Sequence, residues 1–223
     1  MSKFFTFLFS ILIVVSCDRS TGDLVIVENL KSKYRIIYSE QAPDSVLQAI
    51  NAFKANLKLS SGIEFMSFSD IVGPQDEEIL IGPSNRNKSY LSTFPLNEVG
   101  DGYISAVKDK KWNILANSST GLSQGLMDII VRMGALKLNE NITQYNQQPK
   151  IVIPATPLIF KPSFTHRQAI NPNALNESYR QWNFINIDNQ NDWGTWEYSM
   201  ERIFPSESYF NTHPEYFAVV NGK

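Results

Sequence analysis

Between Leu24 and Val152 the chain alternates strand-like runs with helical patterns, and this alternation limits the folds open to it. Residues 24–27 and 34–38 are β-branched and aromatic runs of strand length, and residues 63–68 alternate as a further strand does. A helix is predicted to open at residues 43–45 and to end before Gly62, because apolar side chains recur at helical spacing at Val46, Ile50, Phe53 and Leu57.

The second half of this region repeats the pattern. Residues 78–82 predict a short buried strand, and residues 102–107 and 112–116 flank the polar turn 108–111 as the arms of a hairpin. Residues 118–120 can cap a second helix, whose apolar side chains are Leu122, Leu126, Ile129, Ile130 and Met133. Gly121 and Gly125 on this helix indicate close packing. Residues 24–153 therefore predict an α+β domain, with a mostly antiparallel or mixed sheet that carries helices on one face.

Composition excludes several classes of function. The net charge of −2 and the pI of about 5.7 give no sign of a nucleic-acid partner. One cysteine and two histidines exclude a disulfide framework, a cysteine-rich metal site and a three-histidine zinc site within this chain. Glycine-rich phosphate loops are absent from the sequence. We expect no cofactor and no metal.

The amino terminus reads as a targeting segment rather than as part of the fold. Lys3 precedes an apolar run at residues 4–15, which is too short for the ~20 residues of a spanning helix. The run ends Val14-Val15-Ser16-Cys17, which resembles the signal of a bacterial lipoprotein. The resemblance implies a signal peptide at 1–16, lipidation of Cys17, a tether at 17–23 and a lipid-anchored place in the cell envelope, at the outer membrane or on the periplasmic face.

Composition changes after residue 153. Residues 154–162 contain three prolines and are interpreted as a linker, and the chain then becomes rich in aromatic and polar side chains. Trp193 and Trp196 lie beside Asp192 and Glu197. Aromatic rings with such polar neighbours occur in carbohydrate sites, but composition alone favours a core whose indole groups are satisfied locally.

The last residues carry a family resemblance. The string HPEYFAVVNGK at 213–223 resembles a segment of an uncharacterised bacterial family related to glycoside hydrolases. In that family an α-glucuronidase-like or hexosaminidase-like amino-terminal domain precedes a (β/α)₈ barrel. The resemblance implies that residues 163–223 are the incomplete start of such a barrel, with its first strand at residues 164–167. A whole barrel needs ~250 residues, so at most a quarter is expected here.

The resemblance also suggests roles for single residues. Arg167 would bind sugar hydroxyls or a carboxylate, or else form a salt bridge at the domain junction. Trp193, Trp196 and His213 are further candidates for sugar binding, although His213 before Pro214 can also order its loop. Glycoside hydrolysis normally uses two carboxyl groups, which in such barrels come from middle strands. No catalytic residue is assigned, and the chain alone is expected to be inactive.

Three functions remain open. The first is an envelope lipoprotein that corresponds to the amino-terminal part of a polysaccharide-processing glycoside hydrolase. The second is a surface lipoprotein that binds a glycan without cleaving it, and the third is an envelope protein that serves a structural or partner-binding role through its α+β domain alone. Carbohydrate and the membrane are the expected partners, and the sequence leaves the oligomeric state open.

Overall fold

A computed structural model of the chain describes residues 22–138, 143–164, 166–169, 173, 176–186 and 205–217. The chain divides into two compact units, Met1–Pro162 and Ser163–Lys223, and each is described by itself. The predicted signal peptide, the lipidation site Cys17 and the tryptophans Trp193 and Trp196 lie outside the described residues. Among the helices that are described, none has the length and apolar character needed to cross a membrane.

The first unit is built on a six-stranded mixed sheet with the strand order β10-β5-β6-β4-β2-β3. Its parallel part consists of β3 (Ser67–Ser69), β2 (Arg35–Tyr38), β4 (Glu78–Ile81) and β6 (Lys111–Ala116). β5 (Tyr103–Lys108) runs antiparallel both to β6 and to β10 (Leu158–Phe160). The predicted mixed sheet is therefore confirmed. All four residues of β4 are buried, as expected for a central strand covered on both faces.

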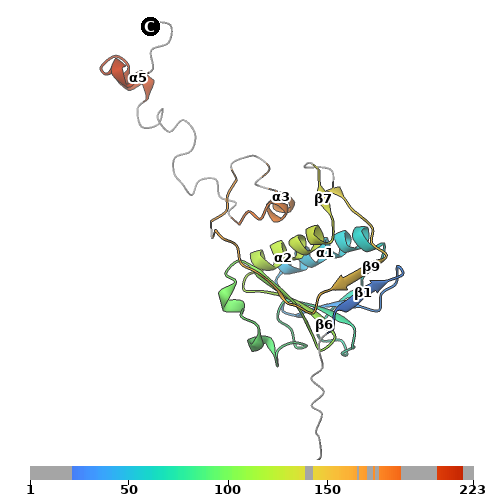
Figure 1. Cartoon of the computed structure of the whole chain (residues 1–223). Helices are drawn as coiled ribbons and strands as arrows, with labels where there is room; N and C mark the ends of the chain where they lie inside the picture. Colours follow the sequence, from blue (N-terminus) through green and yellow to red (C-terminus); the bar gives the residue numbers. More distant parts are fainter. Residues whose placement is uncertain are drawn as a thin grey trace, which may run out of the picture. The chain divides into compact units, whose positions relative to one another are not determined.

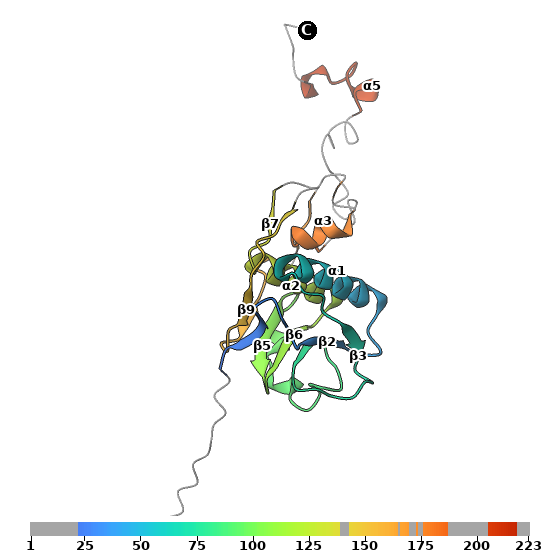
Figure 2. The same ribbon diagram turned by 90° about the vertical axis from the view of Figure 1, so that its right-hand side faces the viewer.

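Two helices cover one face of this sheet (Figures 1 and 2). α1 (Asp44–Ser61) and α2 (Ser119–Arg132) pack against each other, and α2 also lies on β5 and β6. The ring of Phe53 on α1 meets that of Trp112 on β6 edge to face, with centroids 6.2 Å apart. Phe53 and Trp112 are both almost fully buried, so this contact lies in the main core.

The ends of both helices follow the local sequence. Gly62 stops α1 in a left-handed conformation with φ of 74° and donates its N–H to the carbonyl of Lys58. Ser118 begins α2, because its hydroxyl accepts a hydrogen bond from the N–H of Gly121 at 3.0 Å. Both boundaries agree with the sequence prediction.

The hairpin of β5 and β6 is also confirmed. Lys108 pairs with Lys111, which leaves Asp109 and Lys110 as a two-residue turn. Their φ values of 52° and 60° lie in the left-handed region, as a type I′ turn requires. This turn matches the twist of the strands although neither residue is glycine.

Two further strand pairs lie beside the main sheet. β1 (Leu24–Glu28) pairs antiparallel with β9 (Lys150–Ile153), and β7 (Leu136–Lys137) pairs with β8 (Thr143–Gln144). The linker interpretation of residues 154–162 requires correction, because residues 158–160 within it form β10. Leu158, Ile159 and Phe160 are apolar and fill the hydrogen-bonding edge that β5 would otherwise expose.

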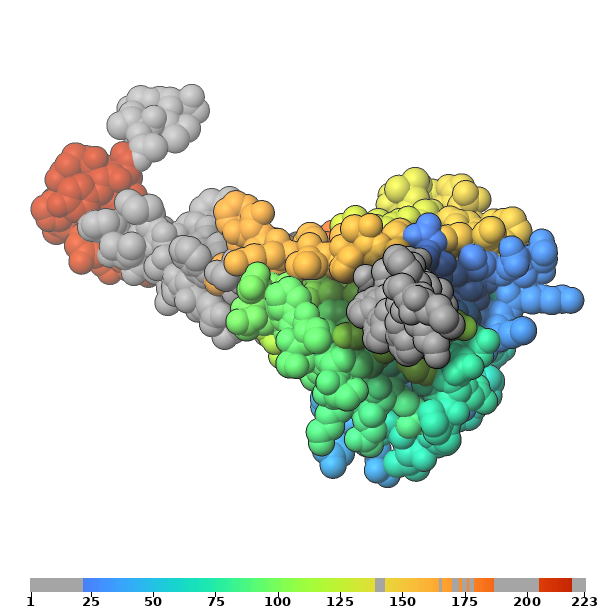
Figure 3. All heavy atoms as spheres, turned by 60° about the horizontal axis from the view of Figure 1, so that its bottom comes forward, coloured from blue at the N-terminus to red at the C-terminus, as the bar shows by residue number. Residues whose placement is uncertain are grey.

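The face of the sheet opposite the helices is covered by irregular segments. The 3₁₀ turns η1 (Leu91–Thr93) and η2 (Leu96–Glu98) bring Phe94 and Leu96 onto a small core formed by Val99, Ile104 and Ala106. Figure 3 views the molecule toward this side, where the teal and green chain between β3 and β5 forms much of the visible surface. The helix-free face is therefore largely covered as well.

The described part of the second unit contains α3 (Glu177–Trp182), α5 (Ser206–Tyr209) and the turn η4 (Pro214–Tyr216). The strand expected at residues 164–167 is not observed at the positions described there, namely 164, 166 and 167. Instead the backbone of Arg167 makes two hydrogen bonds with Asn186. Its N–H donates to Asn186 Oδ1, and its carbonyl accepts from the N–H of Asn186. The start of a barrel stays a prediction.

Candidate functional site

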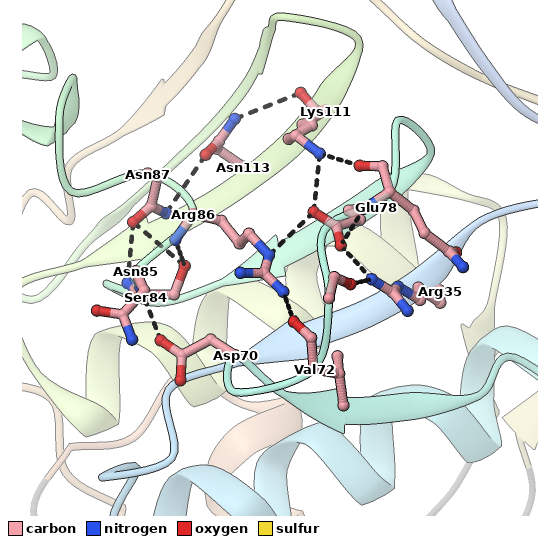
Figure 4. Close-up of polar contacts among 12 residues, drawn as sticks. Arg35, Asp70, Val72, Glu78, Ser84, Asn85, Arg86, Asn87, Lys111 and Asn113 are labelled. Carbon is pink, nitrogen blue, oxygen red and sulfur yellow. Dashed lines mark hydrogen bonds and ion pairs between the residues drawn. The ribbon is translucent and has the colours of Figure 1, made fainter.

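A buried carboxylate forms the polar centre of the helix-free face (Figure 4). Glu78 opens β4, and its side chain has no solvent exposure. Its Oε1 accepts hydrogen bonds from Arg35 Nη2 at 2.7 Å and from the N–H of Gln75 at 3.1 Å. Its Oε2 accepts from Lys111 Nζ at 2.7 Å and lies 3.5 Å from Arg86 Nε. Both oxygens are therefore occupied by protein donors.

The register of the sheet brings these partners together. Arg35 on β2 lies directly opposite Glu78, and Lys111 begins the strand on the other side of β4. Burial disfavours the charged form of Glu78, but the hydrogen bonds from Lys111, Arg35 and Gln75 outweigh it and hold its pKa below the usual value. A buried, ionised carboxylate that accepts three hydrogen bonds from the protein and lies beside a third cation serves as a structural group.

A second carboxylate holds the neighbouring loops. Asp70 follows β3 and accepts hydrogen bonds from the N–H groups of Glu40 at 3.0 Å and Asn85 at 2.7 Å. Burial raises the pKa of Asp70, but these backbone donors and the nearby charge of Arg86 lower it by more, so the pKa lies below its usual value. Asp70 thereby ties three loops, those after β2, β3 and β4, to one another.

Amide side chains continue this network over the sheet. Asn87 is buried, donates to the carbonyl of Gly82 at 3.1 Å and to Asn113 Oδ1 at 3.4 Å, and accepts from the N–H of Ser84 at 2.9 Å. The hydroxyl of Tyr90 also donates to Asn113 Oδ1, at 3.3 Å. The polar groups beneath the covering loop are thus used to hold that loop.

On the helix side, a buried carboxylate joins α2 to β5. Asp128 Oδ2 accepts from the hydroxyl of Tyr103 at 2.5 Å and from Arg132 Nε at 2.8 Å. Burial and the adjacent Asp128 raise the pKa of Tyr103 well above its usual value. The tyrosine therefore stays neutral, and it fixes Asp128 in place for Arg132.

The structure gives Arg167 a set of contacts within the second unit. Its Nε donates to the carbonyl of Phe184 at 2.7 Å, and its Nη1 donates to that of Phe164 at 2.6 Å. The guanidinium therefore joins two segments through their backbones. Its role toward a sugar stays a prediction.

His213 lies in a small aromatic group. Its ring stacks on that of Tyr216, with centroids 4.8 Å apart and planes 9° from parallel, and its Nδ1 is 3.0 Å from Glu215 Oε1. The imidazole side chain is 45% exposed.

The described residues contain no cluster of three or more histidine, cysteine, aspartate or glutamate side chains suited to a metal ion. The charged centre around Glu78 was missed by the sequence reasoning, which read residues 78–82 only as a buried strand. One signal was present, because a glutamate within a strand that is otherwise fully apolar needs buried partners. The identity of those partners is not visible, since Arg35 and Lys111 are distant in sequence.

Comparison with known proteins identifies a fold but no family. No family model and no curated protein matches the chain. Among solved structures, it is similar to BtGH115A, a family GH115 4-O-methyl-α-glucuronidase with specificity for decorated arabinogalactans, with a TM-score of 0.50, 13% identity and 65% of this chain covered. It is also aligned with the Flavobacterium johnsoniae chitobiase (TM-score 0.40, 18% identity, 70% covered) and with Streptomyces plicatus β-hexosaminidase (TM-score 0.41, 12% identity, 66% covered).

The chain corresponds to a fraction of each of these enzymes, namely 19%, 21% and 25% of their lengths. At 13% identity the likeness to the α-glucuronidase concerns the fold alone. The chain therefore has a mixed α+β fold that is similar to part of this enzyme.

Proposed function

We propose that the chain is the amino-terminal part of a polysaccharide-processing, glycoside-hydrolase-like lipoprotein of the bacterial envelope, and that its first unit is a non-catalytic accessory domain. The observation that carries the proposal is the occupied state of Glu78 within a fold shared with part of an α-glucuronidase. Hydrolysis of a glycosidic bond normally needs two carboxyl groups on either side of it. A carboxylate enclosed by Arg35, Lys111 and Gln75 supports the sheet instead.

The proposal is tested by assaying purified residues 18–223 with aryl glycosides and glucuronoxylan oligosaccharides. We expect no turnover above buffer, because the buried carboxylate of Glu78 is held by Arg35, Lys111 and Gln75. Turnover that persists in repurified protein would overturn the inactive assignment. If Glu78→Gln then abolished turnover in a folded protein, the accessory assignment of the first unit would be wrong as well.

The envelope location rests on the lipoprotein-like sequence at residues 14–17. In a bacterial host, the full chain is expected in the membrane fraction with an acylated Cys17, measured by mass spectrometry of the amino-terminal peptide. Cys17→Ala is expected to release the protein from the membrane fraction. Equal membrane recovery of both forms would contradict the lipid anchor.

The exposed stack of His213 on Tyr216 favours glycan binding as a second function. A sugar can place its apolar face on such a ring while Glu215 accepts from its hydroxyls. Binding measured by calorimetry or on a glycan array is expected to fall with Trp193→Ala, Trp196→Ala or Tyr216→Ala, without release of sugar. Phe164→Ala is the control, because Phe164 is an exposed ring outside this group. Equal loss in the control would count against a glycan site.

A further inference from the structure

A cavity opens on the helix side of the first unit, at the edge of the main sheet. Its volume is about 510 Å³, within the range of about 300–1,000 Å³ usual for small-molecule sites. α2 contributes Ile129 and Met133, β9 contributes Ile151 and Ile153, and Trp112 and Leu158 belong to the main sheet. Most of the lining is therefore apolar.

The strand topology creates this space. β9 pairs with β1 and not with the main sheet, whereas β10, which follows directly, joins the edge of β5. The two sheets thus separate between residues 153 and 158, and α2 forms a further wall of the space between them. Pro154 and Pro157 line the connection. Because proline fixes φ, Pro154 and Pro157 limit the conformations open to this connection.

Arg132 is the one charged side chain among the described residues that line the cavity. Its Nε is held by Asp128 at 2.8 Å, and Asp128 is fixed in turn by Tyr103 at 2.5 Å. The contact between Arg132 and Asp128 uses Nε, and the Arg132 side chain is 48% exposed, so a ligand in the cavity can approach its Nη atoms. Such an edge binds a carboxylate through two parallel hydrogen bonds. Asp128 offsets part of the charge, so the apolar walls must supply much of the affinity.

We propose that this cavity binds a small monocarboxylate with an apolar body, whose carboxylate lies against Arg132 and whose body lies among Ile129, Ile151 and Trp112. Apolar walls with a single cation do not suit a saccharide, which has many hydroxyls to satisfy. The site is therefore separate from the carbohydrate function proposed above, and the two can fail independently.

The test is calorimetric titration of the purified chain with octanoate, decanoate and 2-naphthoate, and with octan-1-ol as the uncharged match of octanoate. Saturable binding of a carboxylate is expected, at least about tenfold tighter than that of the alcohol. Arg132→Met keeps the apolar stem and is expected to weaken carboxylate binding about tenfold while leaving the alcohol unchanged. The two body shapes distinguish an aliphatic from an aromatic ligand.

Two further variants keep the result interpretable. Thr156→Trp, at an exposed position in the cavity lining, is expected to weaken the carboxylates and the alcohol alike even if Arg132→Met proves unstable. Lys58→Met is the control, because Lys58 is a cation in the last turn of α1 and does not line the cavity. Absence of saturable binding in the folded chain, equal affinity for octanoate and octan-1-ol, or unchanged binding in Thr156→Trp would overturn the proposal.

Discussion

Glu78 joins segments that would otherwise repel one another. Arg35, Arg86 and Lys111 all approach its carboxylate, and the carboxylate is buried between them. Placing a charge in the interior costs free energy, and the cost is offset only when both oxygens find good partners. Here they do. Arg35 belongs to β2, Arg86 to the loop after β4, and Lys111 to β6. The side chain therefore contributes to the position of the covering loop as well as to the sheet.

Glu78→Gln is expected to destabilise the first unit by about 3–5 kcal/mol, because it leaves buried cations without a counter-charge. The measurement is the free energy of unfolding from urea denaturation at neutral pH. Glu64→Gln is the matched control, since Glu64 forms an exposed ion pair with Lys58. Its denaturation midpoint should stay that of the unaltered chain. If Glu78→Gln changed the free energy of unfolding as little as Glu64→Gln does, the cluster would contribute little to stability.

The same carboxylates set the dependence of stability on pH. The pKa values of Glu78 and Asp70 are both lowered in the folded protein, so the unfolded chain binds more protons as the pH falls. Their stabilisation is complete above the unfolded values near about 4 and is lost as the pH drops through the folded values. Urea midpoints should be level near neutrality and decline below about pH 4. Glu78→Gln should flatten the decline, and an unchanged slope would assign it to other groups.

At the scale of elements, α2 approaches the sheet through glycine. A Cβ on Gly125 would lie 2.5 Å from Tyr103 Cγ, and one on Gly121 would lie 2.7 Å from the carbonyl oxygen of Gly102. Ordinary Cβ contacts are much longer. Gly121 and Gly125 thus allow α2 to contact β5 directly, as the sequence reasoning expected from their spacing.

Gly125→Ala is therefore expected to destabilise the protein by about 1–3 kcal/mol, although alanine favours an isolated helix by about 1 kcal/mol. The opposite sign from helix propensity is what identifies packing as the cause. Thermal unfolding followed by circular dichroism measures it. Gly73→Ala is the control, because a Cβ there would meet no atom within 4 Å. A stabilised Gly125→Ala variant would rule out the close contact.

Elements specified by neighbouring residues could be predicted from the sequence. The turn at Asp109 and Lys110 and the boundary at Gly62 depend on side chains within a few positions, so their patterns are visible. The pairing of β1 with β9 is not visible, because Leu24 meets Ile153 across most of the first unit. β10 was also missed, since its flanking prolines suggested a linker while its three apolar residues are too few to predict a strand.

The candidate site was less predictable for the same reason. Glu78 stands 43 residues from Arg35 and 33 from Lys111, and only the parallel register of β2, β4 and β6 makes them neighbours. The sequence reasoning looked instead to rings and charges close together in the tail. Of those, His213 does have a described aromatic partner in Tyr216, and Arg167 binds backbone carbonyls. The charged cluster around Glu78 depends on contacts between residues distant in sequence, which a local pattern does not reveal.

At the scale of the whole molecule, all the strands described in the main sheet belong to the first unit, Met1–Pro162. The last of them is β10, whose Phe160 packs its ring 5.6 Å from that of Tyr103. Its three residues pair with Ser105, Ile104 and Tyr103 on β5. The boundary of the folded unit therefore lies after Phe160. A chain that ended at residue 157 would lack β10 and would leave β5 as an unpaired edge strand.

Two truncations test this boundary. Residues 22–162 are expected to unfold cooperatively, with a urea midpoint close to that of the same transition in the whole chain. Residues 22–155 lack β10 and should be less stable by about 2 kcal/mol or more, because burial of one large aromatic side chain contributes about 1.5–3 kcal/mol. Phe160→Ala in residues 22–162 serves as the intermediate case, with the strand kept and the ring removed. If residues 22–155 matched 22–162 in midpoint and in resistance to protease, β10 would be dispensable and residues 156–162 would act as a linker after all.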